Sequence, residues 1–232
     1  MAFGKSALIL LAALLPLAPI AMRETAPPQA GLQTPADWTW RLDEPAEMAA
    51  DGKSIAGKWW FVAMPPGWHI TMGPGGVVYH PDYSARGRFV VESEIFLFPD
   101  STDGGVGLFV GGESLGERDA PTYTALLLRK DGMASVSRRE RGVSTPLAAW
   151  AAVEGVKPHG GKDAEKHALR IEADTTTVTF SVDGARVAAL DRPQVSPDGR
   201  FGFRVDKGVN IHVVRLDFTQ QLAPPRPAKG GM

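Results

Sequence analysis

The sequence predicts an all-β protein whose single domain is a sandwich of two antiparallel sheets. Short runs rich in β-branched and aromatic residues recur every ~8–12 residues between turn signals, which is the spacing of a sandwich or barrel. The middle of the chain shows almost no helical period and no repeat of ~20–50 residues. Hydrophobic residues make up 44% of the 232 residues, so the chain can bury a core and global disorder is excluded.

The two ends of the chain differ from its middle. Met1–Lys5 carries one positive charge, and Ala7–Leu17 is an apolar run shorter than the ~20 residues of a membrane-spanning helix. We therefore predict export by a signal peptide to the periplasm or the medium, without membrane contact after cleavage. An uncleaved anchor is the alternative. The predicted division is a signal peptide at 1–21, a flexible linker at 22–35, the sandwich at 36–219 and a disordered tail at 220–232.

About a dozen runs, each bounded by turn residues, predict the strands. In chain order they are Trp59–Met64, Trp68–Met72, Val77–His80, Arg88–Phe98, Val106–Gly111, Thr122–Arg129, Met133–Arg139, Lys166–Ala173, Thr176–Val182, Arg186–Leu190, Arg200–Val205 and Asn210–Phe218. Asp183-Gly184 is the strongest hairpin signal, because this pair tolerates positive φ. We interpret Gly142–Val153 mainly as a crossover that carries a buried Trp150, with at most one helical turn.

The longest run, Arg88–Phe98, has two unlike faces, because side chains alternate along a strand. One face is nearly all apolar and should meet the opposing sheet; it comprises Phe89, Val91, Ser93, Ile95 and Leu97. The other face places Glu92 and Glu94 between apolar ends, which predicts a central strand that lines a concave surface.

Charge and composition exclude several classes of function. The net charge of -1, without a concentrated basic patch, excludes an electrostatic nucleic-acid binder. The absence of cysteine excludes disulfides, thiolate metal sites and thiol catalysis. The five histidines have no short ligand spacing, so we predict no metal or cofactor, with calcium left open at Asp100, Asp103 and Glu113. Arg138–Arg141 is expected to be a solvated strand end. We expect a monomer.

Several segments resemble bacterial secreted domains of the concanavalin A-like lectin/glucanase superfamily, near its 3-keto-disaccharide hydrolase-like branch. They are Gly67–Pro81, Gly87–Pro99, Gly105–Gly112, Tyr123–Gly132, Phe180–Ala188 and Arg200–Val213. The resemblance spans roughly Trp38–Phe218, and it implies a jelly-roll sandwich with a saccharide as the partner. This superfamily contains lectins, hydrolases and domains of unknown role, so the fold alone does not settle the activity.

Glu92 and Glu94 are the candidate catalytic pair. Their Cα atoms should lie ~6.6–7 Å apart on one face, and glycoside hydrolysis uses carboxyl groups separated by ~5–9.5 Å. The glucanases of the superfamily carry the motif Glu-x-Asp-x-x-Glu, but here Leu97 stands in the place of the third acid. The alternative is that both carboxylates pair with arginines on neighbouring strands, for which we nominate Arg129 and Arg204.

Six residues are candidates for ligand binding: Trp68, His69, Tyr79, Arg129, Arg204 and His212. Sugars place their apolar faces on aromatic rings, and planar guanidinium groups suit sugar hydroxyls. The alternative for the tryptophans is packing in the core or at a sheet edge. We therefore expect an exported carbohydrate-recognition domain that binds a saccharide on a concave sheet face. The alternatives are a glycoside hydrolase that uses Glu92 and Glu94, and a structural or interaction domain without a small ligand.

Overall fold

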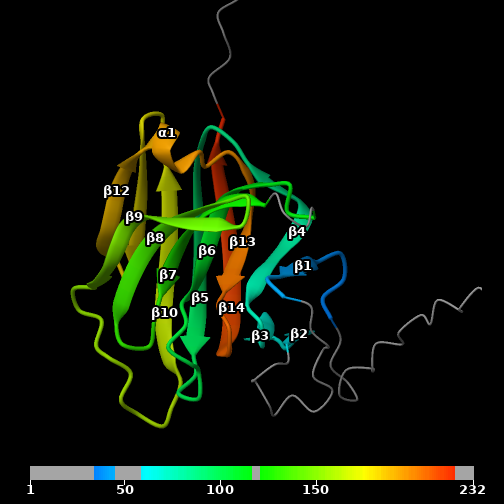
Figure 1. The fold of residues 1–232 in the computed structure, drawn as a ribbon, viewed down its shortest axis with the longest axis vertical. Coiled ribbons are helices and arrows are strands. Elements are labelled where there is room, and N and C mark those ends of the chain that lie inside the picture. Colours follow the sequence, from blue (N-terminus) through cyan, green and yellow to red (C-terminus); the bar gives the residue numbers. More distant parts are fainter. Residues whose placement is uncertain (1–33, 45–58, 117–120, 223–232) are drawn as a thin grey trace, which may run out of the picture.

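Two antiparallel sheets of seven strands each lie face to face in the computed structural model, which describes residues 34–44, 59–116 and 121–222 (Figure 1). This confirms the predicted two-sheet sandwich. The predicted signal peptide at 1–21, almost all of the linker and the last ten residues of the tail lie outside the described residues. Within the described part of the chain, no helix is long and apolar enough to cross a membrane.

The first sheet, which we call sheet A, has the strand order β1-β4-β13-β6-β7-β8-β9. Its strands are β1 (Thr39–Leu42), β4 (Gly76–Ala85), β6 (Val106–Glu113), β7 (Thr122–Leu128), β8 (Met133–Glu140), β9 (Val143–Ala152) and β13 (Gly199–Val205). All neighbours pair antiparallel. Strands that are far apart in the sequence thus become neighbours at the centre of the sheet.

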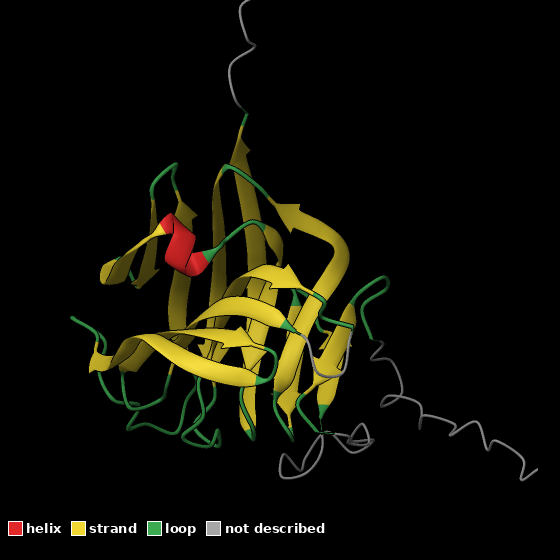
Figure 2. Ribbon diagram, turned by 45° about the horizontal axis from the view of Figure 1, so that its top comes forward, coloured by secondary structure: helices red, strands yellow, loops and turns green. Residues whose placement is uncertain are grey.

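The second sheet, which we call sheet B, has the strand order β12-β11-β10-β5-β14-β3-β2. Its strands are β2 (Trp60–Ala63), β3 (Trp68–Met72), β5 (Arg88–Leu97), β10 (Glu165–Ala173), β11 (Thr177–Val182), β12 (Ala185–Asp191) and β14 (Val209–Gln221). The short helix α1 (Arg192–Val195), red in Figure 2, connects β12 to β13. β5 lies at the centre of this sheet, as the apolar ends of its Glu92 and Glu94 face predict.

The core lies between the two sheets. Phe89, Val91, Ile95 and Leu97 of β5 are at most 2% exposed, which confirms the predicted apolar face. They belong to one buried cluster with the inward residues of sheet A, among them Leu108, Leu126 and Phe203. Burial of each such side chain contributes ~1.5–3 kcal/mol. Ser93 is tolerated there because its hydroxyl donates a hydrogen bond of 2.7 Å to the carbonyl oxygen of Arg215.

The prediction of a crossover at Gly142–Val153 was wrong. Gly142–Val153 is not a crossover but contains the edge strand β9, which pairs only with β8. Pro146 is compatible with a strand because an edge position needs no second row of backbone donors. Most of β9 is exposed on both faces, so no alternation marks it in the sequence. By contrast, the predicted hairpin at Asp183-Gly184 is confirmed, with φ of 51° and 81°.

Candidate functional site

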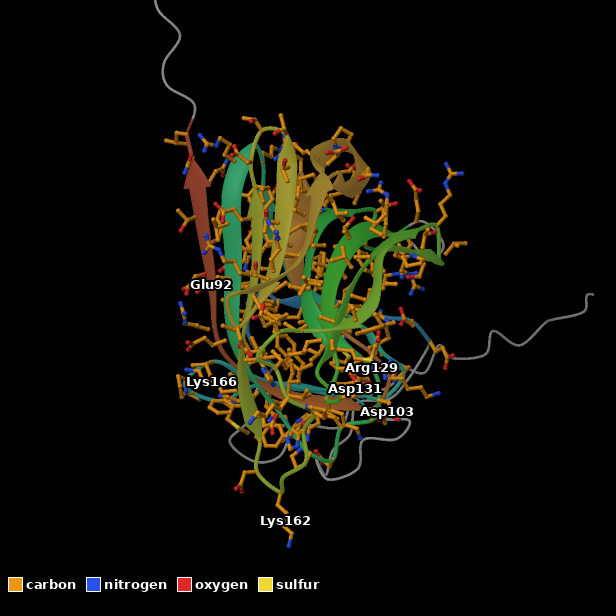
Figure 3. The ribbon with its side chains drawn as sticks, turned by 90° about the vertical axis from the view of Figure 1, so that its left-hand side faces the viewer. Glu92, Asp103, Arg129, Asp131, Lys162 and Lys166 are labelled. Carbon is orange, nitrogen blue, oxygen red and sulfur yellow. The ribbon has the colours of Figure 1, made fainter. Side chains whose placement is uncertain are left out.

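Glu92 and Glu94 lie on the outer face of sheet B, inside a ladder of ion pairs. Arg170 of β10 donates a hydrogen bond of 2.7 Å to Glu92, and the Lys166 ammonium lies 3.1 Å from Glu94. Arg215 of β14 lies 3.3 Å from both carboxylates. Hydrogen bonds from Lys166 and Arg215 lower the pKa of Glu94, although partial burial opposes the shift. Figure 3 shows Glu92 and Lys166 on this outer face. These contacts therefore favour the charged form of Glu94.

The predicted partners of these glutamates were wrong. Basic side chains of neighbouring strands do pair with both carboxylates, but Arg204 lies on β13 and Arg129 directly follows β7, both in sheet A. Figure 3 shows Arg129 on the opposite side of the molecule from Glu92. Alternation along a strand assigns the two faces of that strand, but it does not say which sheet the strand joins. The expected concave face with Glu92, Glu94, Arg129 and Arg204 together does not exist.

A cavity of about 450 Å³ lies on the outer face of sheet A. Alternate residues of β7, β8 and β9 line it because the register aligns them: Ala125 lies beside Ser137, and Ser137 lies beside Pro146. Below the cavity is a second, separate apolar cluster, composed of Val77, Tyr79, Phe109, Leu115, Tyr123, Ala125 and Leu127. The cavity thus combines an apolar floor with the polar side chains described next.

Arg204 is the centre of the polar wall of this cavity. It is only 8% exposed, and its guanidinium donates hydrogen bonds of 3.0 and 2.6 Å to the two oxygens of Asp43. Two more hydrogen bonds, of 3.0 and 2.8 Å, reach one oxygen of Asp206. Asp43 follows β1, so the network connects β1 with β13. Burial favours the neutral form of Asp43, but Arg204, with Arg139 and Arg41, holds the pKa of this carboxyl below its usual value.

Trp150 contributes its ring to the lining of the cavity. Its half-buried ring lies 4.9 Å from the guanidinium carbon of Arg129, within the range of a cation–π contact. Arg129 also forms an ion pair with Asp131, and Lys130 lies 3.3 Å from Asp103. Figure 3 shows Arg129, Asp131 and Asp103 gathered at this end of the molecule. An indole ring with adjacent charged groups offers both an apolar face and polar partners to a ligand.

The predicted ligand-binding residues divide between the two sheets. Arg129, Arg204 and Tyr79 belong to the outer side of sheet A, where Tyr79 lies in the apolar cluster below the cavity. Trp68 packs against the core, with its ring centre 5.0 Å from that of Trp38. Trp68 therefore packs in the protein, as the alternative prediction for the tryptophans stated, and does not line the cavity.

His69 and His212 lie on the outer face of sheet B, opposite each other on β3 and β14. The His69 ring is buried between Trp60 and Phe98, at centre distances of 5.0 and 5.5 Å. Burial, together with the nearby His212, lowers the pKa of His69 to about 4. His212 Nε2 lies 3.0 Å from the carbonyl oxygen of Pro66. These two histidines are therefore remote from the cavity.

Three cavity residues, and Asp43 as the partner of Arg204, were missed in the sequence. Asp43 and Trp150 lie in segments without a recognisable alternation, and Asp206 shares a predicted face with Arg204 but was not selected. Arg139 was expected at a solvated strand end, yet it lines the cavity. The available signal was its position two residues after Ser137 on the same strand face.

Two other hollows lack the combination of an aromatic ring, an apolar floor and buried charged side chains that the cavity on sheet A offers. One, of about 340 Å³, lies between the sheets, and its rings come from Tyr83, Phe201 and Phe218. The other, of about 490 Å³, is bordered by Arg86, Glu113 and Arg200 and has no aromatic residue. Among the described residues, no group of three or more His, Asp or Glu side chains is placed to hold a metal ion.

Solved structures with the same architecture are known, whereas no family model and no curated protein matches the sequence. The carbohydrate binding module CBM66 from Bacillus subtilis is 13% identical, with a TM-score of 0.55 over 77% of this chain and 94% of that one. A glycoside hydrolase family 16 endo-glucanase from Bacteroides ovatus is 11% identical, with a TM-score of 0.53 over 78% and 94%.

A second Bacteroides ovatus GH16 protein, from the mixed linkage glucan PUL, is 11% identical, with a TM-score of 0.54 over 82% of this chain and 97% of that one. At such identities the comparisons show the fold alone. The chain has the concanavalin A-like jelly-roll fold, which confirms the resemblance at the level of the fold. The nearer likeness to the 3-keto-disaccharide hydrolase-like branch stays a prediction.

Proposed function

We propose that the protein recognises a saccharide in the cavity on the outer face of sheet A. The observation that carries this proposal is the convergence of an apolar floor, the Trp150 ring and charged side chains on one hollow of about 450 Å³. Binding sites for small molecules are typically concave, ~300–1,000 Å³ in volume and mostly apolar, with a few polar groups that fix orientation. A carbohydrate binding module and GH16 proteins are among the structures of similar fold, which supports the ligand class.

The state of the acidic side chains favours binding over hydrolysis. A glycosidase needs one carboxyl group that is protonated near neutral pH, which requires a raised pKa. The pKa of Asp43 is lowered instead, because Arg204 and Arg139 outweigh the effect of burial. Asp206 accepts two hydrogen bonds from the same guanidinium. The pKa of Glu94 is also lowered, by Lys166 and Arg215. Neither Asp43 nor Glu94 is therefore suited to act as a general acid.

Binding to a panel of polysaccharides and oligosaccharides, measured by affinity electrophoresis and calorimetry, tests the proposal. Trp150→Ala removes an aromatic ring from the lining of the cavity and should weaken binding about tenfold, equivalent to ~1.4 kcal/mol. Tyr83→Ala is the matched control, because it removes an exposed ring, 43% accessible, from a different hollow. Absence of binding to every saccharide at millimolar concentration, or equal weakening by both substitutions, would contradict the proposed site.

We also propose, from the N-terminal sequence, that this recognition takes place outside the cytoplasm. Fractionation of cells that express the full chain, with mass determination of the product, should give an exported protein that lacks residues 1–21. A full-length protein in the cytoplasm would refute this part of the proposal.

A further inference from the structure

Two arginines face the cavity, and they differ in how they are partnered. Arg204 donates four hydrogen bonds, which involve all three of its guanidinium nitrogens. Within the described part of the chain, Arg139 donates none and makes a single ion pair, with 3.3 Å between its Nη1 and Oδ1 of Asp43. Its Nε–H is buried without an acceptor. Buried polar groups are normally hydrogen-bonded, so Arg139 is the exception in this wall.

Arg139 shares its carboxylate partner with Arg204. Asp206 lines the cavity, Asp43 contacts both arginines, and Arg204 binds both carboxylates. Both oxygens of Asp43 already accept hydrogen bonds from Arg204, at 3.0 and 2.6 Å. The longer contact with Arg139 adds attraction but no hydrogen bond. Within the described part of the chain, Arg139 therefore shares its one carboxylate partner with Arg204.

The surroundings of Arg139 indicate what an additional ligand would contact. The register places Tyr123 on one side of Arg139 and Ser144 on the other, and both line the cavity. Ser137, which also lines it, is two positions away on the same face of β8. Three residues with hydroxyl groups thus neighbour Arg139 in the lining of the cavity. Hydroxyl groups of this kind exchange hydrogen bonds with sugar hydroxyls, and a guanidinium forms its strongest hydrogen bonds with an anion.

We infer that the ligand is an acidic saccharide whose carboxylate binds Arg139, an inference that rests on the proposed saccharide-binding function. A carboxylate in the cavity would supply Arg139 with the hydrogen-bond acceptor that the described residues do not provide. Arginine commonly binds a planar carboxylate through two hydrogen bonds, so a uronic acid is the expected sugar. At the other end of the cavity, the Nε–H of Arg129 is also buried without an acceptor.

The experiment compares one polymer in two charge states. Oligogalacturonate and its methyl ester share the same sugar backbone and differ in whether the carboxyl group is charged. At 150 mM salt, the wild-type protein should bind the acid at least about tenfold more tightly than the ester, by calorimetry. Arg139→Gln should remove this preference, so that the variant binds acid and ester with the same affinity. Arg139→Lys should retain part of it, because it keeps the charge but loses the bidentate edge.

The control is Arg141→Gln, which makes the same charge change on an exposed side chain outside the cavity lining. It should leave the preference intact. If Arg139→Gln does not fold, as judged by circular dichroism, the lysine variant carries the comparison. Equal affinity of the wild type for acid and ester overturns the inference but leaves the proposed function standing. Tighter binding of dextran sulfate than of oligogalacturonate also overturns it. Binding of no saccharide, acidic or neutral, removes the proposed function itself.

Discussion

Replacing Arg204 with methionine should destabilise the fold strongly at neutral pH. The substitution removes four hydrogen bonds and leaves Asp43 and Asp206 charged beside an apolar cluster. Removal of one partner of a buried ion pair typically costs ~3–5 kcal/mol, because the remaining charge has lost its compensation. For a domain of this size, ~1 kcal/mol lowers the melting temperature by ~2–4 °C. We therefore expect a loss of ~6–20 °C.

The pH dependence of this stability loss is a second, independent test of the prediction. The pKa of Asp43 in the folded protein lies below its unfolded value of ~3.9, so the ion pair contributes fully above that value. Its contribution is lost as the pH falls through the folded pKa. In Arg204→Met, burial without Arg204 raises the pKa of Asp43, and protonation then relieves the unpaired charge. The difference in stability between wild type and variant should therefore shrink from pH 7 towards pH 3.

Urea unfolding followed by tryptophan fluorescence, at several pH values, measures both effects. Arg215→Met is the matched control, because Arg215 forms its ion pairs on the exposed face of sheet B. Exposed pairs contribute little, so this variant should unfold near the wild-type midpoint. A loss below ~1 kcal/mol for Arg204→Met at pH 7 would refute the reasoning. So would a loss that stays constant down to pH 3.

Three further predictions concern the fold and sheet B. Gly107→Ala should lower the free energy of unfolding in urea by about 3 kcal/mol, because its Cβ would lie 1.8 Å from the Leu126 carbonyl oxygen. The control Gly116→Ala, whose Cβ would have no atom within 4 Å, should leave the stability unchanged. Equal stability of both variants would contradict this prediction. The His69 ring should titrate near pH 4 by NMR. The free energy of unfolding of the wild type should fall by ~3 kcal/mol between pH 6.5 and pH 4, and this loss should be absent in His69→Gln. A titration near pH 6.5 would show that the ring is not buried. Glu94→Gln should retain full saccharide binding, because Glu94 lies in sheet B and the cavity lies on sheet A. If the wild type hydrolyses 3-keto-glycosides or glucans and this variant does not, catalysis on sheet B is established instead.

Most of the strands follow from local sequence, because alternation and turn chemistry act within a few residues. β3 was predicted with its observed bounds, Trp68–Met72, and the Asp183-Gly184 turn has the expected positive φ at both residues. The two faces of β5 were also assigned correctly, down to the buried Ser93. β9 was missed because an edge strand with exposed faces has no alternation to detect.

What the sequence determined by itself is the all-β class, most of the strands and the two faces of β5, since each depends on neighbouring residues alone. The tertiary structure decided which strands share a sheet, and with that the place of the candidate site. Glu92 and Arg204 were expected on one face but lie on opposite sheets, whereas Asp43 and Arg204, 161 positions apart, form the central ion pair of the cavity. Sheet partners depend on the packing of the whole core, and no local period of the sequence carries that information.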